Sequence, residues 1–239
     1  MNVLLEKFFP VIGVFLSNAL YLAPAPAVYH AVRAGALGSF NVMPQAVMVH
    51  STIAWIFYAL SVQNPYIAAA NLPGVVASIA YAVLTLPLIP RERAPERRAV
   101  QGVLVLGSVV ALVGWSVFVF GGFSAARRSF ALGLYGSLLC VLLFASPLST
   151  VQEVLKTSNA ASIYAPMTIA QCVNCGTWTL YGFAVQDIWV WGPNATGFLL
   201  GLAQVALKLS FPSNSEVDSS AHRLVGTKQA CSDEEDSEP

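Results

Sequence analysis

Two tryptophan–asparagine pairs are the residues in this chain whose types and spacing best suit the binding of a small molecule. Trp55 precedes Asn71 by 16 positions, and Trp178 precedes Asn194 by the same 16. An indole offers a flat apolar face, and an amide offers two N–H donors and an acceptor without carrying a charge. Together they suit an uncharged, polyhydroxylated ring. The structural alternative is that the asparagines join helices and the tryptophans form an interfacial belt, but the duplication favours binding.

The two pairs belong to an internal repeat with an offset of 123 residues. Further matches at this offset are Pro24 with Pro147, Tyr58 with Tyr181, and Gly74 with Gly197. Pro44 and Pro166 are 122 residues apart, which fits a difference of one residue in a loop. Such a repeat predicts two related bundles with a binding site at their interface, as in transporters.

The elements that must position these residues are membrane-spanning helices. Of the 239 residues 56% are hydrophobic and only 10% are charged, and the mean hydropathy is +0.65. Because a soluble domain carries about 25% charged residues, the composition disfavours a soluble enzyme, a disulfide scaffold and a nucleic-acid binder. Apolar stretches of membrane-spanning length predict seven helices, at about residues 9–26, 40–61, 67–89, 101–121, 130–149, 163–184 and 189–210. The strands of a membrane barrel would instead alternate apolar and polar residues.

The offset covers four predicted spans, an even number, so both copies of the repeat enter the membrane from the same side. The predicted fold is therefore an all-α membrane protein with two parallel three-helix repeats joined by a linker helix (3+1+3). The expected boundaries are 1–90 for the first bundle, 91–128 for the linker loop and fourth helix, 129–211 for the second bundle, and 212–239 for a disordered, acidic, cytosolic tail.

The distribution of Lys and Arg predicts the orientation in the membrane, because cytoplasmic loops carry the excess of positive charge. One side receives Arg33, Arg91, Arg93, Arg97, Arg98, Lys156, Lys208, Arg223 and Lys228. The other side receives only Lys7, Arg127 and Arg128. We therefore expect an extracellular or lumenal N-terminus and a cytosolic C-terminus, with loops at 27–39, 90–100 and 150–162 on the cytosolic side.

Four prolines of the repeat lie near the cytosolic ends of predicted spans: Pro24, Pro44, Pro147 and Pro166. Proline removes a backbone hydrogen bond and kinks a helix. The four residues either form a ring of hinges that opens this side, or simply mark the ends of helices.

These features resemble the SWEET (MtN3/saliva) sugar transporters over about residues 8–211. The resemblance rests on the segments Leu22–Pro26, Phe40–Pro44, Trp55–Tyr58 and Asn71 in the first copy, and on Ala145–Ser149, Trp178–Gly182, Asp187 and Pro193–Asn194 in the second. It implies facilitative, bidirectional transport (uniport) of mono- or disaccharides by alternating access.

The resemblance also implies roles for individual residues. Asn71 and Asn194 would bind sugar hydroxyls, and Trp55 and Trp178 would enclose the ring. Ser17, Ser51, Cys140 and Asn174 match positions that shape the pocket, and the four prolines match the family's hinge prolines. Tyr58 and Asp187 match an outer gate closed by a hydroxyl–carboxylate hydrogen bond.

His50 is the only titratable residue well inside a predicted span, and proton-driven carriers generally use such a group. The alternative interpretation, a hydrogen-bonded polar residue that lines the cavity, is favoured, so we expect uncoupled transport. Cys172 and Cys175 have metal-ligand spacing but no second ligand pair, so we expect no metal, no cofactor and no catalysis.

Two other classes remain open on the residues alone: a PQ-loop carrier of amino acids or another metabolite, and a seven-span receptor or sensor. The expected partners are a sugar such as a hexose or sucrose, the lipid membrane and a second copy in a homo-oligomer, with no nucleic acid. The plasma membrane is the expected location.

Overall fold

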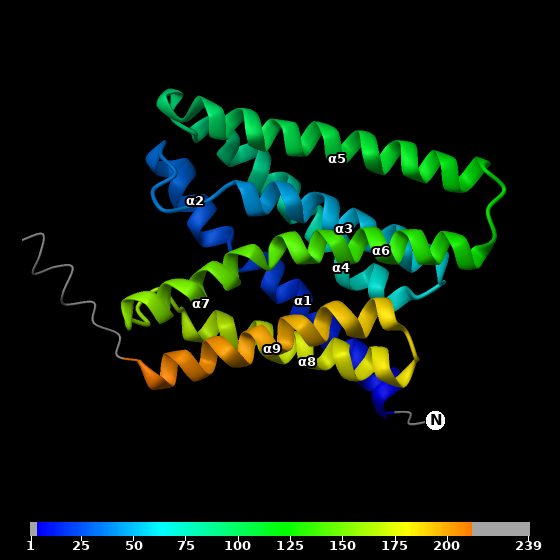
Figure 1. The fold of residues 1–239 in the computed structure, drawn as a ribbon. Helices are drawn as coiled ribbons and strands as arrows, with labels where there is room; N and C mark the ends of the chain where they lie inside the picture. The colour runs from blue at the N-terminus through cyan, green and yellow to red at the C-terminus, as the bar shows by residue number, and fades with distance from the viewer. Residues whose placement is uncertain (1–3, 212–239) are drawn as a thin grey trace, which may run out of the picture.

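Seven segments long enough to cross a membrane run through residues 4–211, the part of the chain that the computed structural model describes (Figure 1). The first consists of the π-helical turn η1 (Leu4–Phe8), α1 (Phe9–Leu22) and α2 (Ala25–Ala34). The second to fourth are α3 (Met43–Ser61), α4 (Pro65–Thr85) with the 3₁₀ turn η2 (Leu86–Leu88), and η3 (Arg91–Arg93) with α5 (Ala94–Phe120). The last three are α6 (Ala125–Leu143) with α7 (Ala145–Thr157), α8 (Ala165–Ala184) and α9 (Ile188–Ser210). The all-α prediction is confirmed for this range, in which no strand occurs.

Four of the segments are apolar and long enough to span a membrane by length and composition alone: Leu4–Ala34, Pro65–Leu88, Arg91–Phe120 and Ala125–Thr157. The remaining three, α3, α8 and α9, carry polar side chains toward the centre of the bundle, among them Ser51, Asn174 and Asn194. Because a polar group in lipid needs a partner or a water-filled cavity, the polar side chains on the inner faces of these three helices help to explain their lower hydropathy.

The two copies of the repeat pack into one another. Within each copy the second and third segments pack together, α3 on α4 and α8 on α9. Between the copies, α1 packs against α8 and α3 packs against α6, while α5 packs mainly on α3 at the edge of the bundle (Figure 1). The interface between the repeats therefore lies in the middle of the molecule, where the predicted site residues are.

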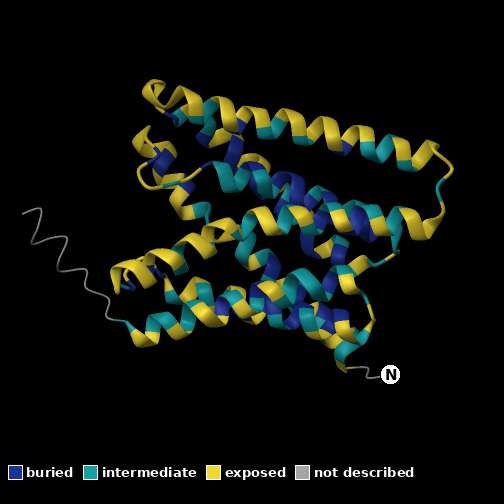
Figure 2. Ribbon diagram, viewed as in Figure 1, coloured by how far each residue is buried: buried dark blue, intermediate teal, exposed yellow. Residues whose placement is uncertain are grey.

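The outer faces of the helices are apolar as well as exposed (Figure 2). On α5, for example, Val105, Leu106 and Leu112 are each 65–68% exposed. An apolar surface of this extent marks a contact with a membrane or partner, and its position around the whole bundle fits lipid.

The first, fourth and fifth segments are longer than predicted, and the expected loops at 27–39, 90–100 and 150–162 are largely wrong, because α2, η3 with α5, and α7 occupy most of them. The chain continues as α2 after Pro24 and as α7 after Phe144. A proline at the N-cap or in the first turn of a helix loses no intrahelical hydrogen bond. Pro24, the N-cap of α2, and Pro147, the third residue of α7, are therefore compatible with a new helix. Val28 on α2 and Val154 on α7 are buried, which holds both additional helices against the bundle.

The environment of His50 also differs from the prediction. Its side chain is 2% exposed and lies against Gly107 of α5, between α3 and α5, and it does not line the central cavity. Neither ring nitrogen has a hydrogen-bond partner among the described residues. The predicted tail, residues 212–239, lies outside the described residues.

Candidate functional site

A cavity of about 500 Å³ lies between the two repeats. Its walls come from α1, α3 and α4 of the first copy and from α6, the start of α7, α8 and α9 of the second. All eight predicted substrate-binding residues line it: Ser17, Ser51, Trp55, Asn71, Cys140, Asn174, Trp178 and Asn194. The lining contains no Asp, Glu, Lys, Arg or His from the described part of the chain.

Each of the two indoles is held by the opposite copy of the repeat. Trp178 Nε1 donates to Ser17 Oγ at 3.0 Å, and Ser17 Oγ in turn donates to Asn174 Oδ1 at 3.0 Å. In the other half, Trp55 Nε1 donates to Cys140 Sγ at 3.4 Å. Ser17 and Cys140 are themselves 123 residues apart. The repeat therefore reproduces an interaction between its own two copies, which orients both rings.

Two glycines that the sequence reasoning missed make room for these indoles. A Cβ atom on Gly13 would lie 2.8 Å from Trp178 Cε2, and one on Gly136 would lie 3.2 Å from Trp55 Cε2. Gly13 and Gly136 also have the offset of 123. A search for every identical pair at this offset would have found them.

The two amides of the cavity share one anchoring interaction. Asn71 Nδ2 donates to the Ile67 carbonyl at 2.8 Å, and Asn194 Nδ2 donates to the Val190 carbonyl at 2.7 Å. Each bond reaches back one turn of the same helix. It holds the amide against its own helix while the side chain still lines the cavity.

Two hydrogen bonds between the copies close one end of the cavity, which we call the tyrosine end. Tyr58 Oη donates to Asp187 Oδ1 at 2.7 Å, as the predicted gate requires. Asn64 Nδ2 donates to Tyr181 Oη, also at 2.7 Å. Asn64 and Asp187 are 123 residues apart, so the second bond is the repeat counterpart of the first. The prediction had named only Tyr58 and Asp187.

The same two polar side chains begin helices. Asp187 Oδ1 accepts hydrogen bonds from the backbone N–H groups of Trp189 and Val190 at the start of α9. Asn64 Oδ1 does the same at the start of α4. An N-cap side chain satisfies backbone donors that have no intrahelical acceptor. The cap fixes the orientation of each side chain. In that orientation Asp187 can accept from Tyr58, and Asn64 can donate to Tyr181.

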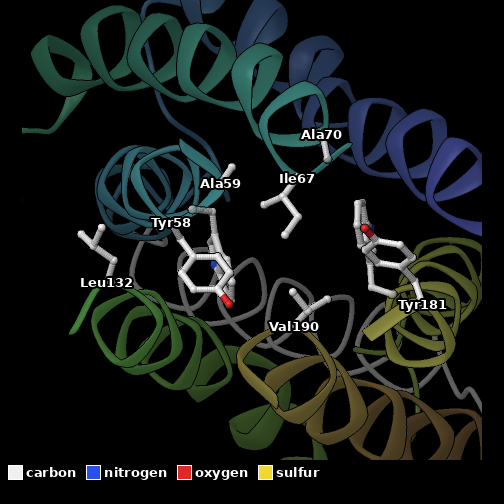
Figure 3. Packing of buried hydrophobic residues seen from close by; sticks show 9 residues of the cluster. Tyr58, Ala59, Ile67, Ala70, Leu132, Tyr181 and Val190 are labelled. Carbon is white, nitrogen blue, oxygen red and sulfur yellow. The ribbon is translucent and has the colours of Figure 1, made fainter. Parts of the chain in front are cut away.

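Apolar side chains fill the space just below these bonds. Ile67 and Val190, again 123 residues apart, are 3% and 2% exposed. Figure 3 shows them pointing toward one another between Tyr58 and Tyr181. Trp55 and Trp178 complete this cluster and stand edge-on to the two tyrosines. The tyrosine end is therefore sealed by a packed apolar layer under two polar bonds.

The opposite end, which we call the proline end, is open. Pro24, Pro44 and Pro147 line the cavity there, together with the exposed residues Ser146, Met167 and Gln171. Pro166 lies in the first turn of α8, is exposed and does not line the cavity. Pro44 likewise lies in the first turn of α3, and Pro147 lies in the first turn of α7, just after the break from α6 at Phe144. Pro24 lies at the break between α1 and α2.

No group of three or more His, Cys, Asp or Glu side chains comes together within residues 4–211. Cys172 and Cys175 are buried on α8, where Cys172 packs against Gly201. Cys175 likewise packs against Gly197, so both cysteines pack between α8 and α9, and Cys175 also lines the cavity.

A helical bundle built from two repeats around a central cavity, closed at one end and open at the other, is the architecture of a membrane carrier. A family model described as "Sugar efflux transporter for intercellular exchange" matches residues 7–93 and again residues 130–216. The chain therefore belongs to the MtN3/saliva family of sugar transporters, whose members are carriers and not enzymes.

Curated relatives and a solved structure agree with this membership. Bidirectional sugar transporter SWEET7 of Arabidopsis thaliana is 25% identical over 85% of this chain and 80% of its own length. SWEET11 of the same plant is 28% identical over 83% of this chain and 68% of its own length. The structure of a eukaryotic SWEET transporter matches with a TM-score of 0.76 at 22% identity, over 85% of this chain and 95% of that one. That likeness concerns the fold.

Proposed function

We propose that this protein is a facilitative, bidirectional sugar carrier that binds mono- or disaccharides in the central cavity and moves them by alternating access. The observation that carries the proposal is the pair of indoles and pair of amides that line one cavity without any charged lining residue. Ring C–H faces would lie on Trp55 and Trp178, and sugar hydroxyls would bond Asn71 and Asn194. Ser17, Ser51, Cys140 and Asn174 would shape the remaining wall.

The absence of carboxylates and histidines from the described lining supports uncoupled transport. A proton-driven carrier generally places a carboxylate or histidine in its pathway. His50 is turned away from the cavity toward α5, and Asp187, at the closed end, is bonded to Tyr58. Sugar should therefore move only down its own gradient. Uphill accumulation that an uncoupler abolishes would contradict this part of the proposal.

The closed tyrosine end and open proline end correspond to one state of an alternating-access cycle. Closing the proline end would require the two bundles to tilt, with the breaks at Pro24 and Pro147 as hinges and Pro44 and Pro166 at the starts of neighbouring helices. The bonds Tyr58–Asp187 and Asn64–Tyr181 would break at the same time. In this proposal residues 1–90 and 129–211 move as two bodies, and residues 91–128 link them.

Orientation and location complete the proposal. Arg33 at the end of α2 and Lys156 near the end of α7 lie at the proline end, as do Arg91 and Arg93 before α5. The positive-inside rule then makes the proline end cytosolic and the tyrosine end extracellular or lumenal. We place the protein in the plasma membrane, as a candidate homo-oligomer; surface labelling and crosslinking in intact cells test both points.

Uptake of radiolabelled sugars in cells that lack hexose transporters tests the function. The wild-type protein should take up at least one sugar from a panel of mono- and disaccharides, in both directions, at a rate independent of the proton gradient. Asn71→Ala or Asn194→Ala should reduce uptake by about tenfold or more, because each removes a polar partner of a buried hydroxyl.

Asn41→Ala is the matched control, because Asn41 is an exposed amide before α3 that bonds the Met43 backbone N–H outside the cavity. Its uptake should equal that of the wild type at equal surface expression. Uptake of an amino acid that sugars do not compete with would contradict the proposal.

A further inference from the structure

The two amides of the cavity differ in one interaction that the repeat does not reproduce. Tyr21 Oη donates to Asn71 Oδ1 at 3.0 Å. The residue 123 positions after Tyr21 is Phe144, which has no hydroxyl to offer Asn194. No hydrogen bond to Asn194 Oδ1 occurs within the described residues. All four side chains line the cavity.

The orientation of the Asn71 amide follows from its neighbours. The Ile67 carbonyl can only accept, so the NH₂ group of Asn71 must face it and the oxygen must face Tyr21. Tyr21 thus occupies one acceptor site of Asn71 Oδ1. Asn194 has the same backbone anchor but keeps its whole carbonyl oxygen available to a ligand.

The surrounding structure holds Tyr21 in this position. A Cβ atom on Gly74 would lie 2.7 Å from Tyr21 Cε2, so the glycine makes the space for the ring beside Asn71. Tyr81 Oη donates to the Tyr21 backbone carbonyl at 3.2 Å, which fixes the chain just before the break at Pro24. In the second copy, Gly197 leaves the equivalent space against Phe144.

We propose that Tyr21 makes the two binding amides unequal and thereby selects one orientation of the sugar in the cavity. This inference rests on the proposed sugar transport. Two repeats related by an axis along the membrane normal would offer an asymmetric sugar two equivalent orientations. Because Tyr21 competes for Asn71 Oδ1, the sugar hydroxyl that needs a full acceptor is directed to Asn194. Tyr21 is in this sense a positioning residue.

Competition by monodeoxyglucoses against uptake of labelled glucose tests the inference. In the wild type, removal of the hydroxyl that donates to Asn194 should weaken competition by roughly 2- to 12-fold, the fold-change of one hydrogen bond, and other positions should matter less. In Tyr21→Phe neither amide oxygen is occupied by a tyrosine, so the sugar can bind in either orientation. The difference in competition strength between the monodeoxyglucoses should then diminish to about half or less. In Phe144→Tyr both amides are occupied, and this difference should diminish in the same way.

The double variant Tyr21→Phe/Phe144→Tyr moves the inequality to the other copy. Because the sugar can turn around with it, this variant should regain the wild-type pattern of deoxy positions. Tyr135→Phe, which removes a hydroxyl from α6 outside the cavity lining, is the matched control and should leave the pattern unchanged.

A wild-type pattern in both single variants, or a double variant that does not regain it, would overturn the inference. Absence of uptake of every sugar in the panel by the wild type would instead contradict the proposed function. If the wild type carries a sugar other than glucose, deoxy analogues of that sugar take the place of the deoxyglucoses. Should Tyr21→Phe not reach the surface, Phe144→Tyr alone decides, since a wild-type pattern in that variant contradicts the unequal amides.

Discussion

Tyr58 and Asp187 are 129 residues apart in the chain, yet the tyrosine hydroxyl donates to the carboxylate over 2.7 Å and joins the two repeats at the closed end of the cavity. The carboxylate also caps α9 through two backbone N–H groups. It is therefore pre-oriented, so that this bond can form on the approach of Tyr58 without a reorientation of the carboxylate.

Removing the Tyr58 hydroxyl should open the tyrosine end. A hydrogen bond to a charged group contributes about 1.5–3 kcal/mol, so Tyr58→Phe should raise the population open at this end by about tenfold or more. Ile67→Cys, buried just below the bond, reports the opening through its labelling rate with a membrane-impermeant thiol reagent added outside. Tyr164→Phe, an exposed tyrosine before α8, is the control. An unchanged labelling rate in Tyr58→Phe would show that the bond does not hold this end closed.

Asn64 should tolerate aspartate but not alanine. Asn64→Ala loses the two N-cap bonds and the bond to Tyr181, and loss of a cap alone costs about 1 kcal/mol. The Tm in detergent should therefore fall by several degrees. Asn64→Asp keeps the caps and can accept from Tyr181, as Asp187 accepts from Tyr58. Asn41→Ala loses one bond to a backbone N–H without any contact to the other copy, and its Tm should fall less. Equal losses in Asn64→Ala and Asn64→Asp would contradict this account.

Alanine at Gly13 should reduce sugar uptake more than alanine at Gly136, because the two glycines differ in their distance from the indoles. Gly13→Ala places its Cβ 2.8 Å from Trp178 Cε2, a contact that forces the ring to move, whereas Gly136→Ala places its Cβ at 3.2 Å from Trp55 Cε2, where a small shift is enough. Overpacking of this kind costs about 1–3 kcal/mol. Sugar uptake at equal surface expression should fall more in Gly13→Ala. Gly102→Ala on α5, with no heavy atom within 4 Å, should have no effect. The reverse order of the first two variants would be inconsistent with the packing described.

Ser17 should act through the orientation of Trp178. Ser17→Ala leaves the indole N–H and the Asn174 oxygen without the hydroxyl that joins them, and an unmade bond of this kind costs about 1–3 kcal/mol. The KM for sugar should rise by about fivefold or more, with a smaller change in the maximal rate. Ser17→Cys, which copies the Cys140 of the other half, should recover part of the loss. Ser108→Ala on the exposed face of α5 is the control. A normal KM in Ser17→Ala would exclude this role.

Hydropathy and the repeat were enough to predict the seven helices and the duplicated tryptophans and asparagines of the cavity. Ser17, Ser51, Cys140 and Asn174 followed only from the family resemblance. Apolar runs of membrane-spanning length can only be satisfied by helices in lipid, and polar residues within them must turn inward. A duplicated polar position such as Asn71 and Asn194 can therefore be recognised from the sequence alone. The helices α2 and α7 were missed because a proline can end one helix or begin another with the same local signal. The sequence around Pro24 therefore does not distinguish a loop from a new helix.

Only the tertiary structure decided which side chains meet. The bonds Ser17–Trp178 and Tyr21–Asn71 join helices far apart in the chain, and hydropathy carries no information about such pairs. His50 illustrates the same limit: its residue type suggested a place in the cavity, but the angular position of residue 50 on α3 turns it toward Gly107 of α5. The sequence by itself determined which segments are helices and which polar side chains each helix carries, since burial in lipid acts on each segment separately. The packing of the two copies decided which of these side chains contact one another, because contacts between helices depend on rotations and distances that no single segment encodes.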